Sequence, residues 1–392
     1  MIKLIKNGRV AYNNGFSDKL IIIRDGVIED IAERAEIPDD AEIFDAAGLT
    51  VLPAFVDTHL HGGGGYDFLD CTEEAFENIF KTHLSHGTLK ICPTLVSCSA
   101  DRMFKFFDAV KPYADDGRFL GLHLEGPFLS QEMCGAQPPG VIVNPTKEFC
   151  DEILRRGGGM ISRITCAPEL PGTEYLAETF LKHGIGLSIG HSAAYAPEVW
   201  KAFSLGFNQT THLFCSSTFR VKRGSYVYGG IAECALLNDD CYVELIGDGH
   251  HISCEIFELA IKVKGYEKVC IVSDAMRAAG EDTEESYLGE ILPQNRVIVE
   301  DGVAKLPDRS FFAGSVATGD NMYRILTDKY GLDEYGVSVM MSLSPSKMLG
   351  ITDGGKIEKG FRADFTMLDE NKNTAAVFQS GKEIKISGAD RL

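Results

Sequence analysis

Eight short apolar runs alternate with longer helical patterns through the middle of the chain, and this alternation limits the fold more than any other feature. The runs cover residues 51–61, 88–96, 119–126, 161–168, 185–191, 207–213, 242–248 and 268–274. Amphipathic stretches lie between them, such as residues 72–86 and 255–264. Strands that alternate with helices predict a parallel sheet, and eight repeats predict an α/β fold with a closed (β/α)8, TIM-like barrel.

The two ends of the chain have a different pattern, with short strands and tight turns. Two apolar runs flank the Asp25-Gly26 dipeptide, which is a strong hairpin signal. The last forty residues have the same character. We predict a small β-sandwich domain from both termini, residues 1–50 and 355–392, and a barrel over residues 51–354. Within the barrel, a β-hairpin insertion is predicted at about residues 281–312, around the Asp301-Gly302 turn.

The bulk properties exclude several classes of protein. The 392 residues carry a formal net charge of −19, which argues against nucleic acid or a membrane surface as a partner because both attract basic surfaces. No apolar stretch is long enough to span a membrane, and the N-terminus lacks a signal-peptide pattern. The 11 cysteines include no Cys-x-x-Cys pair, so we expect free thiols and a cytoplasmic protein.

Histidines and carboxylates follow several of the predicted strands directly. His59 and His61 close the first run and are followed by a glycine stretch, Gly62 to Gly65. Alternate residues of a strand point to the same side, so the two imidazoles converge. Glu125, His191, His212 and Asp274 lie at or next to the ends of other runs, and His251 follows the run 242–248. A lone histidine beside a strand is more often a core residue, but this concentration where barrel enzymes hold their active sites favours a metal site.

These residue types suit metal-assisted hydrolysis. One carboxylate and two histidines hold a divalent ion with an open coordination position, and the ion acidifies a bound water and polarises a carbonyl. Asp274 would take a proton from that water and later give it to the leaving amine. A second ion would bind His59 and His61, with Glu125 as a bridge. We expect one or two divalent ions, zinc or iron first and cobalt or manganese next.

The order of these motifs resembles the amidohydrolase superfamily and, within it, the N-acetylglucosamine-6-phosphate deacetylase family. The resemblance is carried by Pro53-Ala-Phe-Val-Asp-Thr-His-Leu-His-Gly62, Leu122-His-Leu-Glu-Gly-Pro-Phe128, Gly190-His-Ser192, Thr211-His-Leu-Phe214, Asp248-Gly-His-His251, Val272-Ser-Asp-Ala-Met276 and Ala313-Gly-Ser315. It implies one ion on Glu125, His191 and His212, and a second on His59 and His61 in some members. It also implies that Asp274 is the general base and acid, that His251 contacts a sugar phosphate, and that the protein is a homodimer.

The chain departs from this family around the expected substrate. The family's Gly-Ala-His stretch is Gly135-Ala136-Gln137 here, and the residues that follow Thr-His-Leu-Phe begin with Cys215 and Ser216 instead of Asn-Ala. The family's Arg-Glu-Pro-Gly stretch is absent. Candidate substrate-binding residues are therefore His251, Gln137, Cys215, Ser216, Arg220 and Arg223. The basic residues Arg220, Lys222 and Arg223 either bind an anion or form a solvated loop face.

Three functions remain open at this point. The first is a metal-dependent deacetylase that acts on a small amino-sugar substrate, N-acetylglucosamine-6-phosphate, and gives acetate and glucosamine-6-phosphate. The second is an amidohydrolase for another N-acyl sugar, an N-acyl amino acid or a cyclic amide. The third is a non-catalytic, sugar-binding relative, against which the retained ligand candidates argue.

Overall fold

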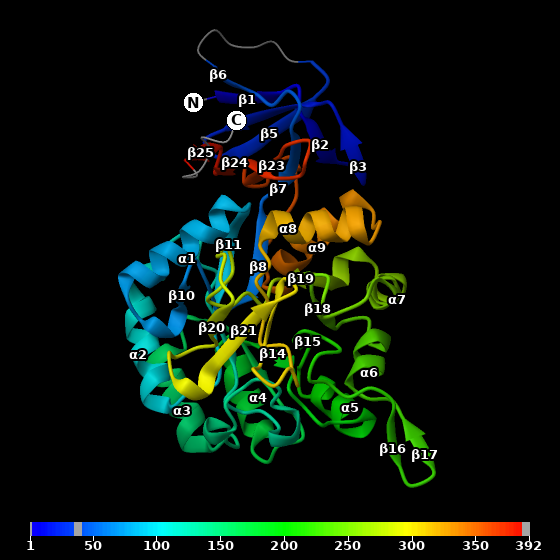
Figure 1. Cartoon of the computed structure of the whole chain (residues 1–392). Helices are drawn as coiled ribbons and strands as arrows, with labels where there is room; N and C mark the ends of the chain where they lie inside the picture. The colour runs from blue at the N-terminus through cyan, green and yellow to red at the C-terminus, as the bar shows by residue number, and fades with distance from the viewer. Residues whose placement is uncertain (1, 35–40, 386–392) are drawn as a thin grey trace. The chain divides into compact units, whose positions relative to one another are not determined.

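The computed structural model describes residues 2–34 and 41–385. The chain forms two compact units, one of residues 1–57, 80–90 and 318–392 and the other of residues 58–79 and 91–317 (Figure 1). The domain limits expected from the sequence include residues 1, 35–40 and 386–392, which lie outside the described residues.

The predicted barrel is confirmed. One sheet holds eight parallel strands in the order β19-β18-β15-β14-β13-β12-β11-β8. Their bounds are β8 Phe55–Leu60, β11 Thr88–Leu95, β12 Leu122–Glu125, β13 Ile161–Cys166, β14 Gly186–Ile189, β15 Gln209–Thr210, β18 Tyr242–Ile246 and β19 Val269–Val272. Leu60 of β8 also forms a parallel bridge with Ala275, just beyond β19, so the first and last strands meet.

Helices follow these strands along the chain, and α2 to α5 lie outside the sheet (Figure 1). In α1, the buried Phe76, Ile79 and Leu84 alternate at helical spacing with the exposed Glu77 and Lys81, which is the pattern of an amphipathic helix. The helices predicted at residues 72–86 and 255–264 are confirmed as α1 and α7. The bounds are α1 Glu73–Ser85, α2 Ala100–Val110, α3 Lys147–Gly157, α4 Thr173–Lys182, α5 Ala196–Ser204, α6 Ile231–Leu237, α7 Cys254–Lys264, α8 Gly319–Arg324, α9 Glu334–Met341 and α10 Leu343–Met348.

The prediction of a single first strand over residues 51–61 is wrong. The run contains two strands: β7 (Thr50–Pro53) belongs to a different sheet, and the barrel strand β8 begins at Phe55. Between them, the backbone N–H of Ala54 donates to the carbonyl oxygen of Asp364. Residues 51–56 are all apolar, so the hydropathy of the run contains no signal for the break.

The strands of both termini form two further sheets, as predicted. Their orders are β5-β4-β1-β6 and β25-β24-β23-β7-β2-β3, and β7 pairs antiparallel with β23. Buried side chains from both sheets, including Ile21, Val51 and Phe365, form one apolar core, which makes this part a β-sandwich. The bounds are β1 Ile2–Lys6, β2 Arg9–Tyr12, β3 Gly15–Ser17, β4 Leu20–Arg24, β5 Val27–Ala32, β6 Glu42–Asp45, β23 Phe365–Leu368, β24 Thr374–Gln379 and β25 Lys382–Ile384.

Smaller sheets lie in the loops that follow the barrel strands. Where the sequence predicts a hairpin insertion, β20 (Glu285–Tyr287), β21 (Arg296–Glu300) and β22 (Val303–Lys305) form a three-stranded antiparallel sheet. Two hairpins complete the set: β9 Gly62–Gly63 with β10 Tyr66–Asp67, and β16 Val221–Arg223 with β17 Tyr226–Tyr228. Among the described residues, no helix combines the length and the apolar character that a membrane span requires.

Candidate active site

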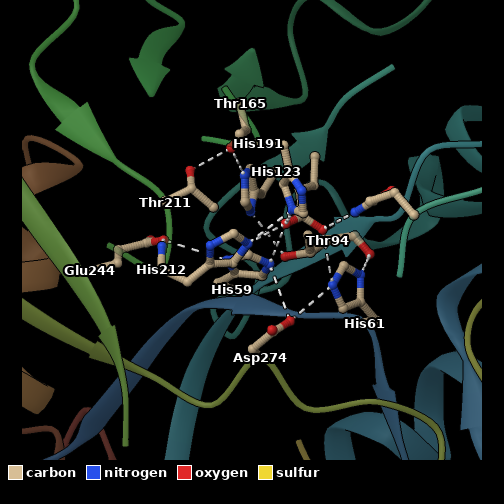
Figure 2. A network of polar contacts seen from close by, with 12 residues as sticks. His59, His61, Thr94, His123, Thr165, His191, Thr211, His212, Glu244 and Asp274 are labelled. Carbon is tan, nitrogen blue, oxygen red and sulfur yellow. Dashed lines mark hydrogen bonds and ion pairs between the residues drawn. The ribbon is translucent and has the colours of Figure 1, made fainter. Parts of the chain in front are cut away.

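The residues predicted as metal ligands, together with Asp274, meet at the carboxyl ends of the barrel strands (Figure 2). His59 lies in β8 and His61 directly follows it, while Glu125 ends β12. His191, His212 and Asp274 each stand two residues beyond the end of a strand, after β14, β15 and β19. All six side chains are buried. The parallel strands thus bring together residues that are more than 200 positions apart in the sequence.

Three of these residues have an unusual backbone conformation. The φ angles of His191, His212 and Asp274 are 47°, 31° and 49°, in the left-handed region that residues other than glycine rarely adopt. Each sits where the chain leaves its strand and turns toward the site. Such conformations persist where the surrounding structure enforces them, and they cluster at functional sites.

Glu125, His191 and His212 offer three ligand atoms that point at one another. Glu125 Oε1 lies 2.8 Å from His212 Nε2 and 3.0 Å from His191 Nε2, and the two Nε2 atoms are 3.1 Å apart. Ligand atoms that share one tetrahedral zinc ion, at about 2.0–2.2 Å each, lie roughly 3.3 Å from one another. The donor types and their spacing therefore fit a divalent transition-metal ion.

His59 and His61 extend the cluster on its other side. His61 Nε2 lies 3.3 Å from Glu125 Oε2 and 3.1 Å from Asp274 Oδ1, and His59 Nε2 lies 3.4 Å from Asp274 Oδ1. Three groups have the composition and closeness to hold an ion: Glu125 with His191 and His212, His59 with His61 and Glu125, and His59 with His212 and Asp274. Glu125 belongs to two of these groups and lies between them.

The two carboxylates of the cluster favour their ionised forms. Burial raises the pKa of Glu125, but the neighbouring histidines, His59 above all, outweigh burial and hold this pKa well below its usual 4.5. Burial likewise raises the pKa of Asp274, and His59 and His61 together lower it below 3.8. The opposite holds for His61, where burial lowers the pKa but Asp274 and Glu125 raise it to about 9. The two carboxylates are therefore balanced by protonated imidazole while no ion is bound, and a divalent ion would take the place of those protons.

Hydrogen bonds behind the cluster orient its imidazoles. The Nδ1 atoms of His61 and His191 lie 3.2 Å and 2.9 Å from the carbonyl oxygens of Thr94 and Met133. Since a carbonyl oxygen only accepts, Nδ1 carries a proton in both rings, which leaves Nε2 as the atom that can bind an ion. This is the arrangement that a metal-ligating histidine requires.

Gln137, a predicted substrate-binding residue, also contacts the candidate metal ligand Glu125. Its Oε1 accepts from the backbone N–H of Ser97 at 2.8 Å, and its Nε2 donates to Glu125 Oε2 at 2.6 Å. The Ser97 contact fixes which end of the amide is the acceptor. Gln137 therefore holds the second oxygen of Glu125 while the first oxygen faces His191 and His212.

A cavity of about 180 Å3 opens over the cluster. His251, Gln137, Cys215 and Ser216, four predicted substrate-binding residues, line this cavity. The His251 imidazole donates from Nδ1 to Asp248 Oδ2 at 2.7 Å, and its ring centroid is 4.7 Å from that of Phe312. Leu288, Phe311 and Phe312, from the segment after β19, add an apolar wall that the sequence did not reveal.

Arg220 and Arg223 do not reach the cavity. Both are exposed residues next to or within β16, and the guanidinium carbon of Arg223 lies 5.3 Å from the Tyr195 ring centroid. No lysine or arginine appears among the described residues that line the cavity.

Two further residues near the site, Arg163 and Glu244, were not predicted from the sequence. Both are buried beneath the cluster. Their only sign in the sequence is a charged residue inside an apolar strand.

Comparison with known proteins agrees with this geometry. The sequence model of the amidohydrolase family matches residues 50–178. An N-acetylglucosamine-6-phosphate deacetylase of Lysinibacillus sphaericus is 30% identical over 97% of both chains. An N-acetylgalactosamine-6-phosphate deacetylase of Escherichia coli O157:H7 is 25% identical over 97% of this chain and 99% of its own.

The fold comparison gives the same result. The crystal structure of N-acetylglucosamine-6-phosphate deacetylase from Pasteurella multocida superimposes with a TM-score of 0.90 and 26% identity, over 98% of this chain and all of its own. A likeness of this extent covers the barrel and the β-sandwich alike. The chain therefore belongs to the amidohydrolase family, in the branch that contains the N-acetylglucosamine-6-phosphate deacetylases.

Proposed function

We propose that this chain is a metal-dependent deacetylase that hydrolyses the acetyl amide of N-acetylglucosamine-6-phosphate to acetate and glucosamine-6-phosphate. The observation that carries this proposal is the convergence of Glu125, His191 and His212 within 2.8–3.1 Å of one another, beside an ionised Asp274 and under one cavity. The near full-length similarity to curated deacetylases supports the substrate.

Glu125, His191 and His212 would hold the first ion, and His59 with His61 the second. When bound, a divalent ion supplies Lewis acidity, which polarises the amide carbonyl and lowers the pKa of water. Imidazole and carboxylate ligands suit zinc or iron first, then cobalt or manganese. The carbonyl contacts of His61 and His191 keep both Nε2 atoms turned to the site.

Asp274 is the proposed general base and acid. Asp274 lines the cavity, and its Oδ1 lies 3.1 Å from His61 Nε2. Its lowered pKa keeps it ready to accept a proton at neutral pH. It takes one proton from the attacking water as the C–O bond forms. It then gives that proton to the amine as the C–N bond breaks, so the side chain returns to its starting state.

His251, Gln137, Cys215 and Ser216 are proposed to bind the sugar phosphate, since all four line the cavity. The phosphate needs a cationic partner, and none of the described residues that line the cavity is a lysine or an arginine. The β16–β17 hairpin exposes Arg220 and Arg223, and we propose that it supplies one of them to the site of a second copy in a homodimer. We also propose a cytoplasmic location and two domains, a β-sandwich of residues 1–50 with 355–392 and a barrel of residues 51–354.

The first experiment is amine release from three substrates, each with zinc-loaded and iron(II)-loaded protein: N-acetylglucosamine-6-phosphate, its galactosamine epimer, and unphosphorylated N-acetylglucosamine. We expect the first to give the highest kcat/KM, of order 10⁴ M⁻¹s⁻¹ or more. Preference for the galactosamine epimer would reassign the sugar. No turnover of any of the three, with metal shown to be bound, would reject the proposal and favour another N-acyl sugar, an N-acyl amino acid or a cyclic amide.

A further inference from the structure

A buried ion pair lies in the barrel beneath the candidate metal cluster. Arg163 of β13 and Glu244 of β18 are both fully buried, with 0% of each side chain exposed. Figure 2 shows Glu244 next to His59 and His212. Burying two charges is costly, and apolar residues of similar size often fill such a space with equal or better stability. The pair therefore calls for an explanation other than packing.

The guanidinium of Arg163 holds one oxygen of Glu244. Arg163 Nη1 donates to Glu244 Oε1, which also accepts from Thr58 Oγ1 at 3.1 Å. The other terminal nitrogen, Nη2, donates to Ser188 Oγ at 3.1 Å and to Thr211 Oγ1 at 3.3 Å. These contacts come from four barrel strands or the residues next to them, so the position of the Glu244 carboxylate is fixed from several directions.

The second oxygen of Glu244 faces the cluster. Glu244 Oε2 lies 3.4 Å from His59 Nδ1 and 3.4 Å from the backbone nitrogen of His212. An Nδ1–H that donates to this carboxylate leaves the Nε2 lone pair of His59 for the site. That Nε2 atom lies 3.4 Å from Asp274 Oδ1 and 3.6 Å from Glu125 Oε1. Carboxylates behind a ligating histidine set its tautomer and ring orientation in metal sites.

We propose that Glu244 is a positioning residue for His59, that Arg163 holds the Glu244 carboxylate in place, and that the pair thereby strengthens ion binding by the groups that include His59. The inference rests on the proposed metal-dependent function. The group of Glu125, His191 and His212 does not include His59. We therefore expect the affinity of this group for its ion to depend less on Arg163 and Glu244.

The chain offers a matched control in its other unit. Lys90 and Asp364 form a second buried ion pair, with Nζ and Oδ2 2.5 Å apart and side chains 5% and 6% exposed. Asp364 Oδ1 accepts from the backbone N–H of Ser380. Among residues 2–34 and 41–385, neither Lys90 nor Asp364 belongs to a group that could hold an ion. Neutralising this pair changes a buried charge pair without changing what lies behind His59.

The experiment titrates the metal-free, full-length protein with zinc against a competing chelator, and with cobalt(II) by visible absorption. Four proteins are compared: wild type, Glu244→Gln, Arg163→Met/Glu244→Gln, and Lys90→Met/Asp364→Asn. The double variant at the site removes both charges together, so it avoids the uncompensated arginine that Glu244→Gln leaves buried. Circular dichroism and thermal unfolding verify that each protein is folded.

We expect the wild type to bind two ions, and both Glu244 variants to bind one of them 10- to 100-fold more weakly, with an altered cobalt spectrum. The control double variant should keep both affinities. The proposal is overturned if the folded Arg163→Met/Glu244→Gln protein binds zinc with wild-type stoichiometry and affinity, or if the control loses affinity equally. Because no turnover is measured, failure of the proposed deacetylase activity leaves this result readable.

Discussion

The side chains at the carboxyl ends of the barrel strands and those in the core of the β-sandwich are both buried, but they are of opposite kinds. The sandwich core is a cluster of aliphatic and aromatic residues such as Ile23, Met367 and Phe378. The strand ends of the barrel bury histidines and carboxylates instead. Apolar burial stabilises a fold, whereas polar burial costs free energy unless every group is paired. The sandwich core therefore serves to stabilise the fold, whereas the strand ends of the barrel are arranged for chemistry.

Left-handed backbone residues differ in the same way. In the sandwich they include Asn13, Asn14 and Asp25, turn residues that tolerate this conformation and connect neighbouring strands. In the barrel they include His191 and His212, which directly follow barrel strands and are candidate metal ligands. The conformation of the first set suits the local turns. The conformation of the second set directs side chains into the candidate site.

The largest expected effect is at Asp274. Changing Asp274→Asn keeps the size of the side chain but removes the proton acceptor, so we expect kcat to fall by about 10²–10⁴-fold. Steady-state amine release measures the loss, and metal content checks that the ions remain bound. A fall of less than tenfold with normal metal content would remove Asp274 from the proposed mechanism.

The sandwich core should show the converse effect. Phe365 is completely buried there, and Phe365→Ala is expected to lower the free energy of unfolding by about 3–5 kcal/mol. Urea unfolding measures this change, with Phe365→Leu as the milder control. Zinc affinity of the folded fraction should stay at the wild-type value; a parallel loss of zinc affinity would contradict the separation of the two regions.

Removing the metal tests whether the activity and the stability of the protein depend on an ion bound by the polar cluster. Dialysis against a chelator should abolish turnover, and zinc at 100 times its Kd should restore about 2.7 kcal/mol of stability. Thermal unfolding with and without zinc checks this, and Glu125→Ala serves as the matched variant because it removes a ligand from two of the three groups. Equal melting temperatures for the wild type in both conditions would argue against a resident ion.

A smaller, pH-dependent effect is expected at Asp320. Burial raises the pKa of Asp320, but His86, at 3.0 Å, and the N–H and hydroxyl of Thr374 outweigh burial and hold it below the usual 3.8. A lowered folded-state pKa adds stability above pH 3.8 that is lost as the pH falls through the folded value. Asp320→Asn should therefore cost about 1–2 kcal/mol at pH 7.

Chemical unfolding at pH 7 and at pH 3 measures this difference. The gap between Asp320→Asn and wild type should narrow at the lower pH, where the wild-type carboxylate begins to lose its charge. A gap that stays constant would mean that Asp320 stabilises through its hydrogen bonds alone.

Much of the fold and the central cluster could be read from the sequence. Alternating apolar runs and helical patterns are local properties, and they correctly predicted the barrel, the α1 and α7 helices and the β4–β5 hairpin. His59, His61, Glu125, His191, His212 and Asp274 were found because each ends a predicted strand, and parallel strands of a barrel must end at one face. The alternation of strands and helices, and the position of these residues at the strand ends, were sufficient to predict the cluster.

Other features were decided only in the folded chain. The division of residues 51–61 into β7 and β8 depends on which sheet each strand joins. Gln137 binds Glu125 and the backbone of Ser97, 40 positions away. Arg163 and Glu244 are 81 positions apart, and neither neighbourhood in the sequence reveals the other. Periodicity determines which face of an element is buried, whereas partners between distant elements depend on strand register and closure, which only the packing of the barrel sets.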